Sequence, residues 1–217
     1  MTKPVIVLGG GGHAKVLIDM LRRLDCRVLG IIDPNQAVGN LAHGFKVMGG
    51  DDAVFGYSPE AVELANAIGS LPNDKGLRAK LFKAFSAKGY CFKTLVDPTA
   101  IVASDIELSA GVQVMAGVII QAGTRIAFNS IVNSGAIVEH DCRIGSHVHI
   151  ASGAVLSGAV EVGDAVHIGT GATIIQGISI GGGSIIGAGS VITQSIACDQ
   201  IVYPARPLIR SISRDKV

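Results

Sequence analysis

The sequence has few aromatic and few charged residues, which narrows the classes of partner it could bind. Phe, Trp and Tyr make up 4% of the 217 residues, with no tryptophan, and Asp, Glu, Lys and Arg make up 16%. Few aromatic rings leave few surfaces on which nucleobases could stack. The net charge of +1 gives no basic patch for a phosphate backbone. We therefore expect no nucleic acid among its partners.

The sequence also lacks a long hydrophobic run and a paired cysteine motif. Although the mean hydropathy is +0.49, no segment stays apolar for the ~20 residues that a membrane-spanning helix needs. The opening MTKPVIVLGGGGHAK has too short an apolar run for a signal peptide. The four cysteines are far apart and form no CxxC motif. We expect a cytoplasmic protein with reduced thiols and no membrane partner.

The second half of the chain contains a period of six. Every sixth residue from Val102 to Ile192 is Val, Leu or Ile, which gives sixteen consecutive aliphatic positions. A second column, two residues before each of these, is mostly small or β-branched. This period predicts a hexapeptide parallel β-helix, in which three hexads close one triangular coil. Sixteen hexads predict a little over five coils, with each aliphatic side chain pointing inward and stacked on the one eighteen residues later.

The first half alternates strand and helix patterns, which is typical of a small Rossmann-like α/β domain with a parallel sheet. PVIVLGGGGHAKVLIDMLRRLD predicts a strand, a glycine turn and a helix, and CRVLGIIDPN predicts a second strand that ends at Asp33. AVELANAIGS is a possible third strand, and DKGLRAKLFKAFSAKG predicts a helix ended by Gly89. The apolar period predicts that the first helix buries Val16, Leu17, Met20, Leu21 and Leu24.

The strand–helix alternation and the six-residue period predict two domains and a tail. We expect an α/β domain over residues 1–94, a β-helix domain over 95–196 and a tail over 197–217. The tail contains IVYPARPLIRSI, which has room for one helical turn.

The glycine turn between the first strand and the first helix is typical of an anion site. Glycines let the backbone approach a phosphate, and the helix N-terminus adds a partial positive charge. Gly9, Gly11 and Ala14 form G-x-G-x-x-A, with Asp33 later in the chain, but this fingerprint alone is weak evidence for a dinucleotide. Because the domain is also short, we favour a nucleotide with one nucleoside, contacted by Asp33. The alternative is that the glycines only permit a tight turn.

Three of the six histidines fall within GAIVEHDCRIGSHVHIASG. His140 is flanked by carboxylates and could converge with Asp141 at a turn, which would make a general base near neutral pH. His149 and His167 are eighteen residues apart and should stack on neighbouring coils. Three interpretations stay open: a base for acyl transfer, a zinc site as in β-helix carbonic anhydrases, or solvated outward residues. For His147 and His167 we favour the last.

The motifs GGGGHAKV, IIDPN, NSGAIVEHDCRIGSHVHIASGAVLSG and YPARPL together resemble those of a bacterial family. This family is the sugar acetyltransferases of the sialic acid O-acetyltransferase and nucleotide-sugar N-acetyltransferase group. The resemblance covers nearly the whole chain. It implies a homotrimer of left-handed β-helices with acetyl-CoA between neighbouring subunits. It also implies that the N-terminal domain holds the nucleotide of a UDP-, dTDP- or GDP-linked amino sugar.

The resemblance assigns the reacting groups. His140, in E-H-[DE]-C, matches the family's general base, and Asp141 matches the acidic residue that orients it. His149 matches a histidine near the acetyl group, and Gly158 matches a glycine whose backbone N–H meets the thioester carbonyl. Arg206, in the tail, matches a CoA contact, although Val202 stands where the family's G-x-P-A-[KR] tail often has glycine.

The resemblance also assigns the acceptor site. Gly11, Gly12 and His13 match phosphate and sugar contacts, Asp33 matches a nucleoside contact, and Asn133 matches an asparagine beside the acceptor.

The predicted function is therefore direct transfer of an acetyl group from acetyl-CoA to the amine of a nucleotide-linked 4-amino-4,6-dideoxy sugar. It needs no metal and no covalent acyl-enzyme, and we interpret Cys142 as core packing because it falls in the inward small column. One alternative is O-acetylation of a sialic acid type acceptor. Others are a zinc-dependent hydratase and a nucleotide-sugar binding protein without catalysis.

Overall fold

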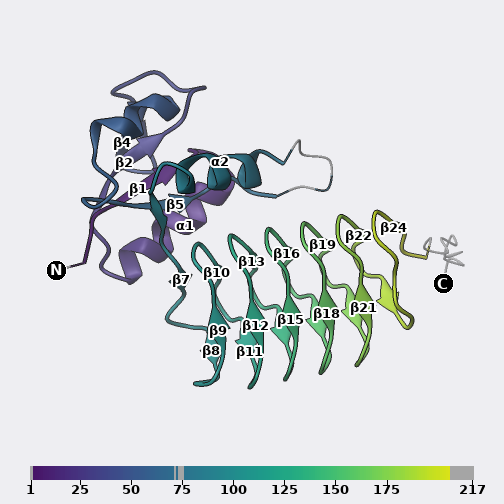
Figure 1. The fold of residues 1–217 in the computed structure, drawn as a ribbon. Helices are drawn as coiled ribbons and strands as arrows, with labels where there is room; N and C mark the ends of the chain where they lie inside the picture. The colour runs from purple at the N-terminus through teal and green to yellow at the C-terminus, as the bar shows by residue number, and fades with distance from the viewer. Residues whose placement is uncertain (1, 71, 73–75, 206–217) are drawn as a thin grey trace, which may run out of the picture.

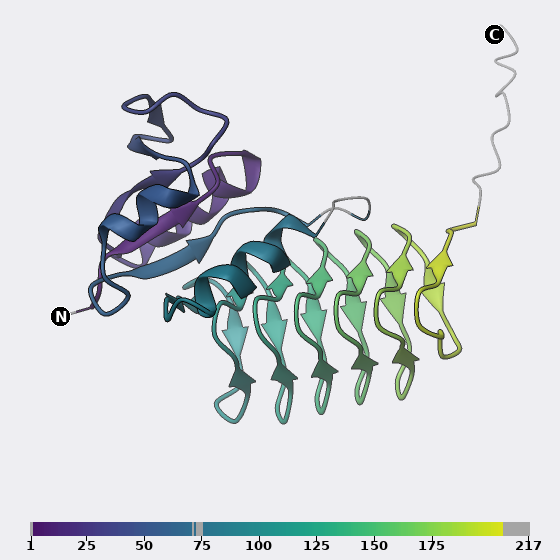
Figure 2. The same cartoon turned by 45° about the horizontal axis from the view of Figure 1, so that its top comes forward.

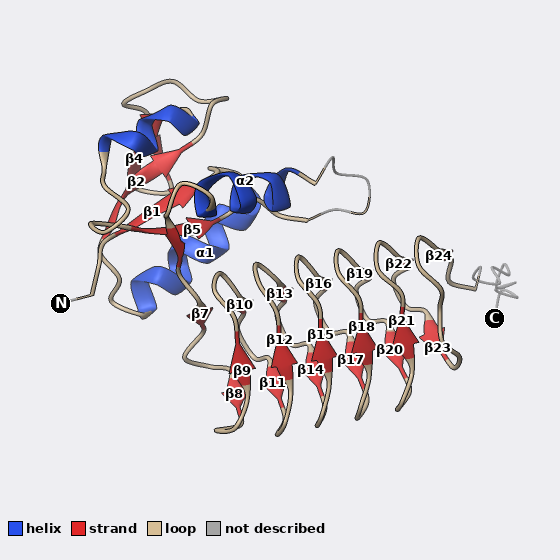
Figure 3. Cartoon of the chain, viewed as in Figure 1, coloured by secondary structure: helices blue, strands red, loops and turns tan. Residues whose placement is uncertain are grey.

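The computed structural model describes residues 2–70, 72 and 76–205 of the chain. An α/β domain comes first and stands over the first coils of a β-helix, as Figure 1 shows. Within the described residues the two α-helices belong to the α/β domain, and the coils carry only short strands and turns (Figure 3).

The α/β domain has a central sheet in the strand order β3-β4-β2-β1-β5-β6. Strands β1, β2 and β5 correspond to the three predicted ones. The paired strands run parallel except for β3, which is antiparallel to β4. The sheet is therefore mixed and not wholly parallel as predicted, because β3 and β4 form a short antiparallel hairpin at its edge. The strands are β1 (Val5–Leu8), β2 (Val28–Ile32), β3 (Leu41–Ala42), β4 (Phe45–Gly49), β5 (Glu63–Asn66) and β6 (Cys91–Phe92).

Two α-helices and one 3₁₀ helix complete this domain: α1 (Gly12–Arg23), η1 (Asp51–Gly56) and α2 (Leu77–Ser86). Helix α1 packs on the sheet through Ala14, Leu17, Ile18, Met20 and Leu21. The prediction that Val16 is part of this core is wrong, because its side chain is 47% exposed and lines the cavity described below. Leu24 is half-buried against the core.

The β-helix has three sheets of short parallel strands, and the chain passes through them in turn (Figure 2). We call them the docked sheet, the aliphatic sheet and the polar sheet. The docked sheet has β7 (Leu95–Val96), β10 (Gln113–Val114), β13 (Ile131–Val132), β16 (His149–Ile150), β19 (His167–Ile168), β22 (Ile185–Ile186) and β24 (Ile201–Val202). The aliphatic sheet has β8 (Ile101–Val102), β11 (Ile119–Ile120), β14 (Ile137–Val138), β17 (Val155–Leu156), β20 (Thr173–Ile174) and β23 (Val191–Ile192). The polar sheet has β9 (Glu107–Leu108), β12 (Arg125–Ile126), β15 (Arg143–Ile144), β18 (Glu161–Val162) and β21 (Ser179–Ile180).

The pairing register confirms the predicted repeat. Val114 pairs with Val132, which pairs with Ile150, so partners are eighteen residues apart. From Val114 to Ile192 the aliphatic column is buried. The final coil is shorter, because β24 pairs with β22 at a spacing of sixteen residues. The predicted tail therefore begins with a strand, and its remainder from residue 206 lies outside the described residues.

Residues with positive φ recur every six positions at the turns between strands. Most are glycines, but Asn129, Asp141 and His147 take the same conformation at φ 57°, 60° and 61°. Asn and Asp tolerate this left-handed conformation better than most residues because their short polar side chains can bond locally. Asp141 is therefore suited to the turn in which it stands beside His140.

Candidate active site

A cavity of about 700 Å³ lies between the α/β domain and the docked sheet. Its walls come from the glycine turn, the carboxyl end of β2, the loop after β5, helix α2 and the turns around β13 and β16. Six of the predicted residues line it: Gly11, Gly12, His13, Asp33, Asn133 and His149.

The glycine turn leaves open space beside the N-terminus of α1. No atom lies within 4 Å of the position that a side chain would take at Gly11 or Gly12. Helix α1 has no side-chain cap at Gly11 and no acidic residue in its first turn. Its first N–H groups and its dipole therefore favour an anion such as a phosphate.

The carboxylate of Asp33 is held in place by hydrogen bonds within the α/β domain. It accepts hydrogen bonds from Gly10 N (3.0 Å), Asn35 N (2.9 Å) and Gln36 Nε2 (2.9 Å). Burial opposes ionisation, but these hydrogen bonds outweigh it and lower the pKa of Asp33 below its ordinary value. The carboxylate therefore stays ionised and can act as an acceptor.

His13 is a neutral ring with a defined orientation. Its Nε2 is 2.8 Å from Gln113 Oε1, and Gln113 Nε2 donates to Asn66 O at 2.8 Å. Since Gln113 uses its amide group as a donor elsewhere, His13 must donate through Nε2 and keep Nδ1 as an acceptor. Burial, and then the charge of Arg78, lower the pKa of His13 to about 4. This tautomer suits a hydroxyl or amine donor better than a phosphate.

The two domains are joined by a buried polar network around Arg78, whose residue is 4% exposed. Its guanidinium donates to Asn129 O, Asn66 O and Ile68 O. Asn66 Nδ2 also donates to Asn129 Oδ1 at 3.1 Å. These bonds fix the α/β domain against the β-helix and thereby fix the walls of the cavity.

His147 belongs to this contact, so the prediction of a solvated outward residue is wrong. It is half-buried, its Nδ1 lies 2.9 Å from Asn129 Nδ2, and the ring of Phe82 packs against it at 5.6 Å. Burial, and then the charge of Lys83, lower the pKa of His147.

His149 and His167 lie on neighbouring coils, as predicted. Their rings meet edge-on at 5.0 Å, so His167 is half-buried and not simply solvated. His149 Nδ1 lies 2.8 Å from Ser70 O, and its Nε2 lies 3.3 Å from Asn133 Nδ2. Since the carbonyl can only accept, Nδ1 carries the proton and Nε2 accepts. His149 therefore shapes the cavity wall and is not placed as a free base.

His140, Asp141 and Gly158 meet at the turns that join the aliphatic sheet to the polar sheet. His140 Nδ1 lies 2.8 Å from Asp141 Oδ2, and both side chains are largely exposed, at 63% and 69%. A Cβ at position 158 would lie 2.5 Å from His140 Nε2, so only glycine permits this ring position. Nδ1 is held by a carboxylate and Nε2 lies over the Gly158 backbone, which is the arrangement of an oriented general base.

Cys142 is part of the core, as predicted. It is fully buried, and its Sγ contacts Ser157 O at 3.3 Å. Burial raises the pKa of its thiol, which disfavours the thiolate that a nucleophile needs.

The cavity and the His140 turn are on opposite sides of one β-helix. In each coil the chain runs from the polar strand to the docked strand, then to the aliphatic strand, and back to a polar strand. His140 is therefore at the corner opposite the docked sheet, whereas Asn133 is at the corner between the docked and aliphatic sheets. One chain therefore does not bring His140 and the cavity together.

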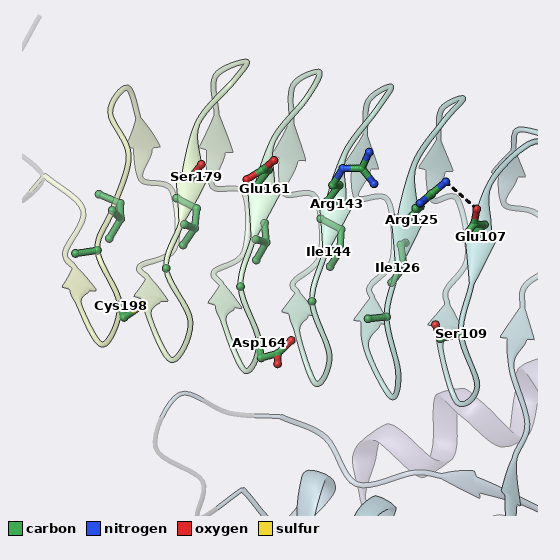
Figure 4. Close-up of a pocket in the computed structure, with 18 residues that line it drawn as sticks. Glu107, Ser109, Arg125, Ile126, Arg143, Ile144, Glu161, Asp164, Ser179 and Cys198 are labelled. Carbon is green, nitrogen blue, oxygen red and sulfur yellow. Dashed lines mark ion pairs between the residues drawn. The ribbon is translucent and has the colours of Figure 1, made fainter.

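A second hollow, of about 690 Å³, runs along the polar sheet (Figure 4). Glu107 and Arg125 form an ion pair there at 3.1 Å. The hollow is lined by no residue that was predicted for the site, so we do not assign the chemistry to it. Arg206 lies outside the described residues. Among those that are described, no group of three or more His, Cys, Asp or Glu could hold a metal ion, and no helix has the length and apolarity to cross a membrane.

Several cavity residues could not be identified from the sequence. Val16, Ile68, Leu77 and Leu81 form an apolar lining, and their pattern is that of ordinary core residues. Asp51 also lines the cavity and follows the parallel strand β4. Its place at the carboxyl end of a strand is a signal that could have found it.

Comparisons with known proteins agree along the chain. A family model of the PglD N-terminal domain matches residues 4–85, and one of the bacterial transferase hexapeptide (six repeats) matches 123–158. PerB from Caulobacter crescentus, in complex with CoA and GDP-perosamine, is 37% identical over 95% of this chain and 97% of its own, with a TM-score of 0.84. A single-residue variant of perosamine N-acetyltransferase from the same organism is 35% identical over 93% of both chains, with a TM-score of 0.83.

The acetyltransferase domain of PglB from Neisseria gonorrhoeae FA1090, in complex with acetyl coenzyme A, is also similar. It is 32% identical over 96% of this chain and 100% of its own, with a TM-score of 0.84. Among curated proteins no sequence match is significant.

Proposed function

This chain belongs to the PglD-type sugar N-acetyltransferases with hexapeptide repeats, and from this premise we propose how its residues share the reaction. An acetyl group passes from acetyl-CoA to the amine of a nucleotide-linked 4-amino sugar. The cavity holds the nucleotide sugar, and His140 of a neighbouring copy removes the proton. The observation that carries this proposal is that all five residues predicted to bind the acceptor line one cavity beside an open helix N-terminus, together with His149.

The cavity offers a place for each part of the acceptor. The open N-terminus of α1 suits the phosphates. Asp33, which follows β2 and holds Gly10 N, can accept a hydrogen bond from the nucleoside. His13 Nδ1 can accept from a hydroxyl or the amine of the sugar. GDP-linked sugars are the first candidates, because the related Caulobacter structures contain GDP-perosamine.

The reaction is a general-base-assisted acyl transfer. The sugar nitrogen attacks the thioester carbon while His140 Nε2 takes a proton from it. Asp141 stabilises the imidazolium through Nδ1–H. The Gly158 N–H, which has no acceptor among the described residues, is available to the oxyanion, and such a donor typically contributes ~3 kcal/mol. The C–S bond then breaks, and the imidazolium returns the proton to the departing CoA thiolate.

A homotrimer would bring the two halves of the site together. The outward side chains of the aliphatic sheet form a column that is apolar except for Thr173, and its ends are 67% and 66% exposed at Ile101 and Val191. The column consists of Ile101, Ile119, Ile137, Val155, Thr173 and Val191. Such a largely apolar face is typical of an interface. If this face turns toward a threefold axis, the His140 corner of one copy meets the Asn133 corner of the next. Acetyl-CoA would then lie between subunits.

The test is release of CoA thiol from acetyl-CoA with a panel of acceptors. The panel contains GDP-, UDP- and dTDP-linked 4-amino-4,6-dideoxy sugars and free sialic acid. We expect turnover with one nucleotide amino sugar and its loss in His140→Ala. Turnover with sialic acid alone would refute the proposed acceptor, and undiminished turnover in His140→Ala would refute the proposed base.

A further inference from the structure

We propose that His43 is a positioning residue that aims the Gly11 N–H at the phosphates of the bound nucleotide. It does so by holding the carbonyl of Gly10. This inference rests on the proposed function, because it assumes that the cavity binds a nucleoside diphosphate group. His43 belongs to none of the motifs in the first half of the chain, and it does not line the cavity.

The contact comes from the edge hairpin of the α/β sheet. His43 stands at the tip between β3 and β4, with φ 51°, and Gly44 follows with φ 87°. His43 Nε2 lies 3.0 Å from Gly10 O, so Nε2 must carry a proton and donate it. Arg22 Nη2 donates to His43 O at 2.7 Å, which ties the hairpin tip to helix α1.

Peptide geometry converts this contact into an orientation. The carbonyl of Gly10 and the N–H of Gly11 belong to one planar trans peptide and point in opposite directions. The carbonyl faces His43, which is outside the cavity, so the N–H of Gly11 faces the opposite way. Gly11 lines the cavity. Within the described part of the chain, its N–H has no protein acceptor.

A glycine peptide at this place needs such a restraint. Glycine adopts many backbone conformations, so the Gly10–Gly11 peptide could turn over and present its carbonyl to an anionic ligand. Asp33 already holds the Gly10 N–H at 3.0 Å. His43 holds the Gly10 carbonyl from the other side, and the two contacts together fix the turn with a donor toward the cavity.

A matched pair of variants isolates the hydrogen bond. His43→Gln retains an N–H donor at a similar reach, and His43→Met has nearly the same shape without a donor. Both place an unbranched side chain at the same positive φ, so backbone strain is common to them. Calorimetric titration with GDP and with guanosine then separates the diphosphate contribution from that of the nucleoside. UDP is compared with uridine, and dTDP with thymidine, in the same way.

We expect His43→Met to weaken binding of the diphosphate about tenfold, as loss of one charge-assisted hydrogen bond does, and to leave nucleoside binding unchanged. His43→Gln should recover most of the loss. With the preferred nucleotide sugar, KM should rise in His43→Met while kcat stays within about twofold.

Other outcomes separate the two proposals. Equal loss of nucleoside and diphosphate binding, or no difference between Met and Gln, would overturn the role of His43 and leave the proposed function standing. A wild-type protein that binds no diphosphate more tightly than its nucleoside would overturn the phosphate site itself, and the inference with it. Equal melting temperatures of the two variants show that both remain folded.

Discussion

The separation of His140 from the cavity leads to a quantitative prediction about mixed oligomers. If each active site combines the cavity of one copy with the base of the next, two inactive variants should complement each other. The first variant is His140→Ala, which keeps the cavity. The second is Gly11→Leu, which keeps the base. No atom lies within 4 Å of the Gly11 side-chain position, and its φ is −80°, so leucine fits the fold while it occupies the proposed phosphate position.

The expected magnitude follows from counting sites in a cyclic trimer. The two variants are co-expressed with different tags and purified through both, so that every oligomer contains both chains. Whether a mixed trimer has two copies of one variant or of the other, only one neighbouring pair combines an intact cavity with an intact base. The activity per trimer should therefore be about one third of wild type. Each variant alone should be inactive in the thiol-release assay.

A second mixture provides the control. Wild type is combined with a chain that carries both substitutions, so the same mutant groups are present in a different arrangement. Shared sites predict that wild-type neighbours are required, so a trimer with a single wild-type chain is inactive. Sites within one chain predict about one third of wild-type activity for that trimer. Gly56→Leu, at another open glycine outside the cavity, should keep full activity alone. Absence of complementation in mixed trimers would refute the shared site.

Four further predictions follow from single side chains. Asp141→Asn should lower kcat by about a hundredfold or more with little change in KM, because an amide can hold His140 in the wrong tautomer; an unchanged kcat would contradict the role of Asp141. Gly158→Ala should lower kcat without loss of thermal stability, because its Cβ would displace the exposed His140 ring, and a variant with full activity would show that this ring position is not required. Cys142→Ala should lower the free energy of unfolding by about 1–2 kcal/mol and keep kcat within about twofold. An acyl-cysteine mechanism would instead require that this variant lose all activity. The pKa of His13 is about 4 in the folded protein and 6.5 in the unfolded chain. Between pH 6.5 and pH 4 the unfolded chain therefore binds more protons than the folded protein, so the free energy of unfolding should fall by about 2–3 kcal/mol as the pH drops through that window. Urea unfolding of His13→Gln should show a flatter pH dependence over the same range.

The β-helix could be predicted from the sequence because its period is a property of neighbouring residues. Each hexad places one aliphatic side chain inside, and the next coil repeats the pattern, so the column from Val102 to Ile192 is sufficient to define the coils. The column ends at Ile192 because the final coil has sixteen residues and not eighteen between partners. The last strand, Ile201–Val202, is therefore out of phase, and the period could not reveal it.

The α/β domain was harder to predict in detail, because the same apolar pattern occurs in residues that pack in the core and in residues that line the cavity. Val16 fits the helical period of α1, yet it is 47% exposed and lines the cavity. A valine that faces a cavity and a valine that faces the core cannot be told apart in the sequence. Val16 therefore lies on the side of α1 that faces the cavity and not on the side that packs on the sheet. The extents of the two domains and a cytoplasmic location stay predictions.

The histidines show where local reasoning ends. His140 and Asp141 are adjacent, so their pairing at a turn could be inferred from the sequence. In the structure the pair forms at a turn where Asp141 has a positive φ. His147 and His13 take their states from partners that are far away in the chain: Asn129 and Phe82 for the first, Gln113 for the second. The contacts of His13 with Gln113 and of His147 with Phe82 cross from the α/β domain to the β-helix, so they depend on the docking that the buried Arg78 network holds. The contact of His147 with Asn129 lies within the β-helix, between neighbouring coils. The tautomer and charge of a cavity histidine are thus consequences of domain docking. A substitution such as Arg78→Met should therefore weaken acceptor binding through His13 even though the His140 pair is untouched, and a rise in KM with unchanged kcat is the kinetic result that this dependence requires.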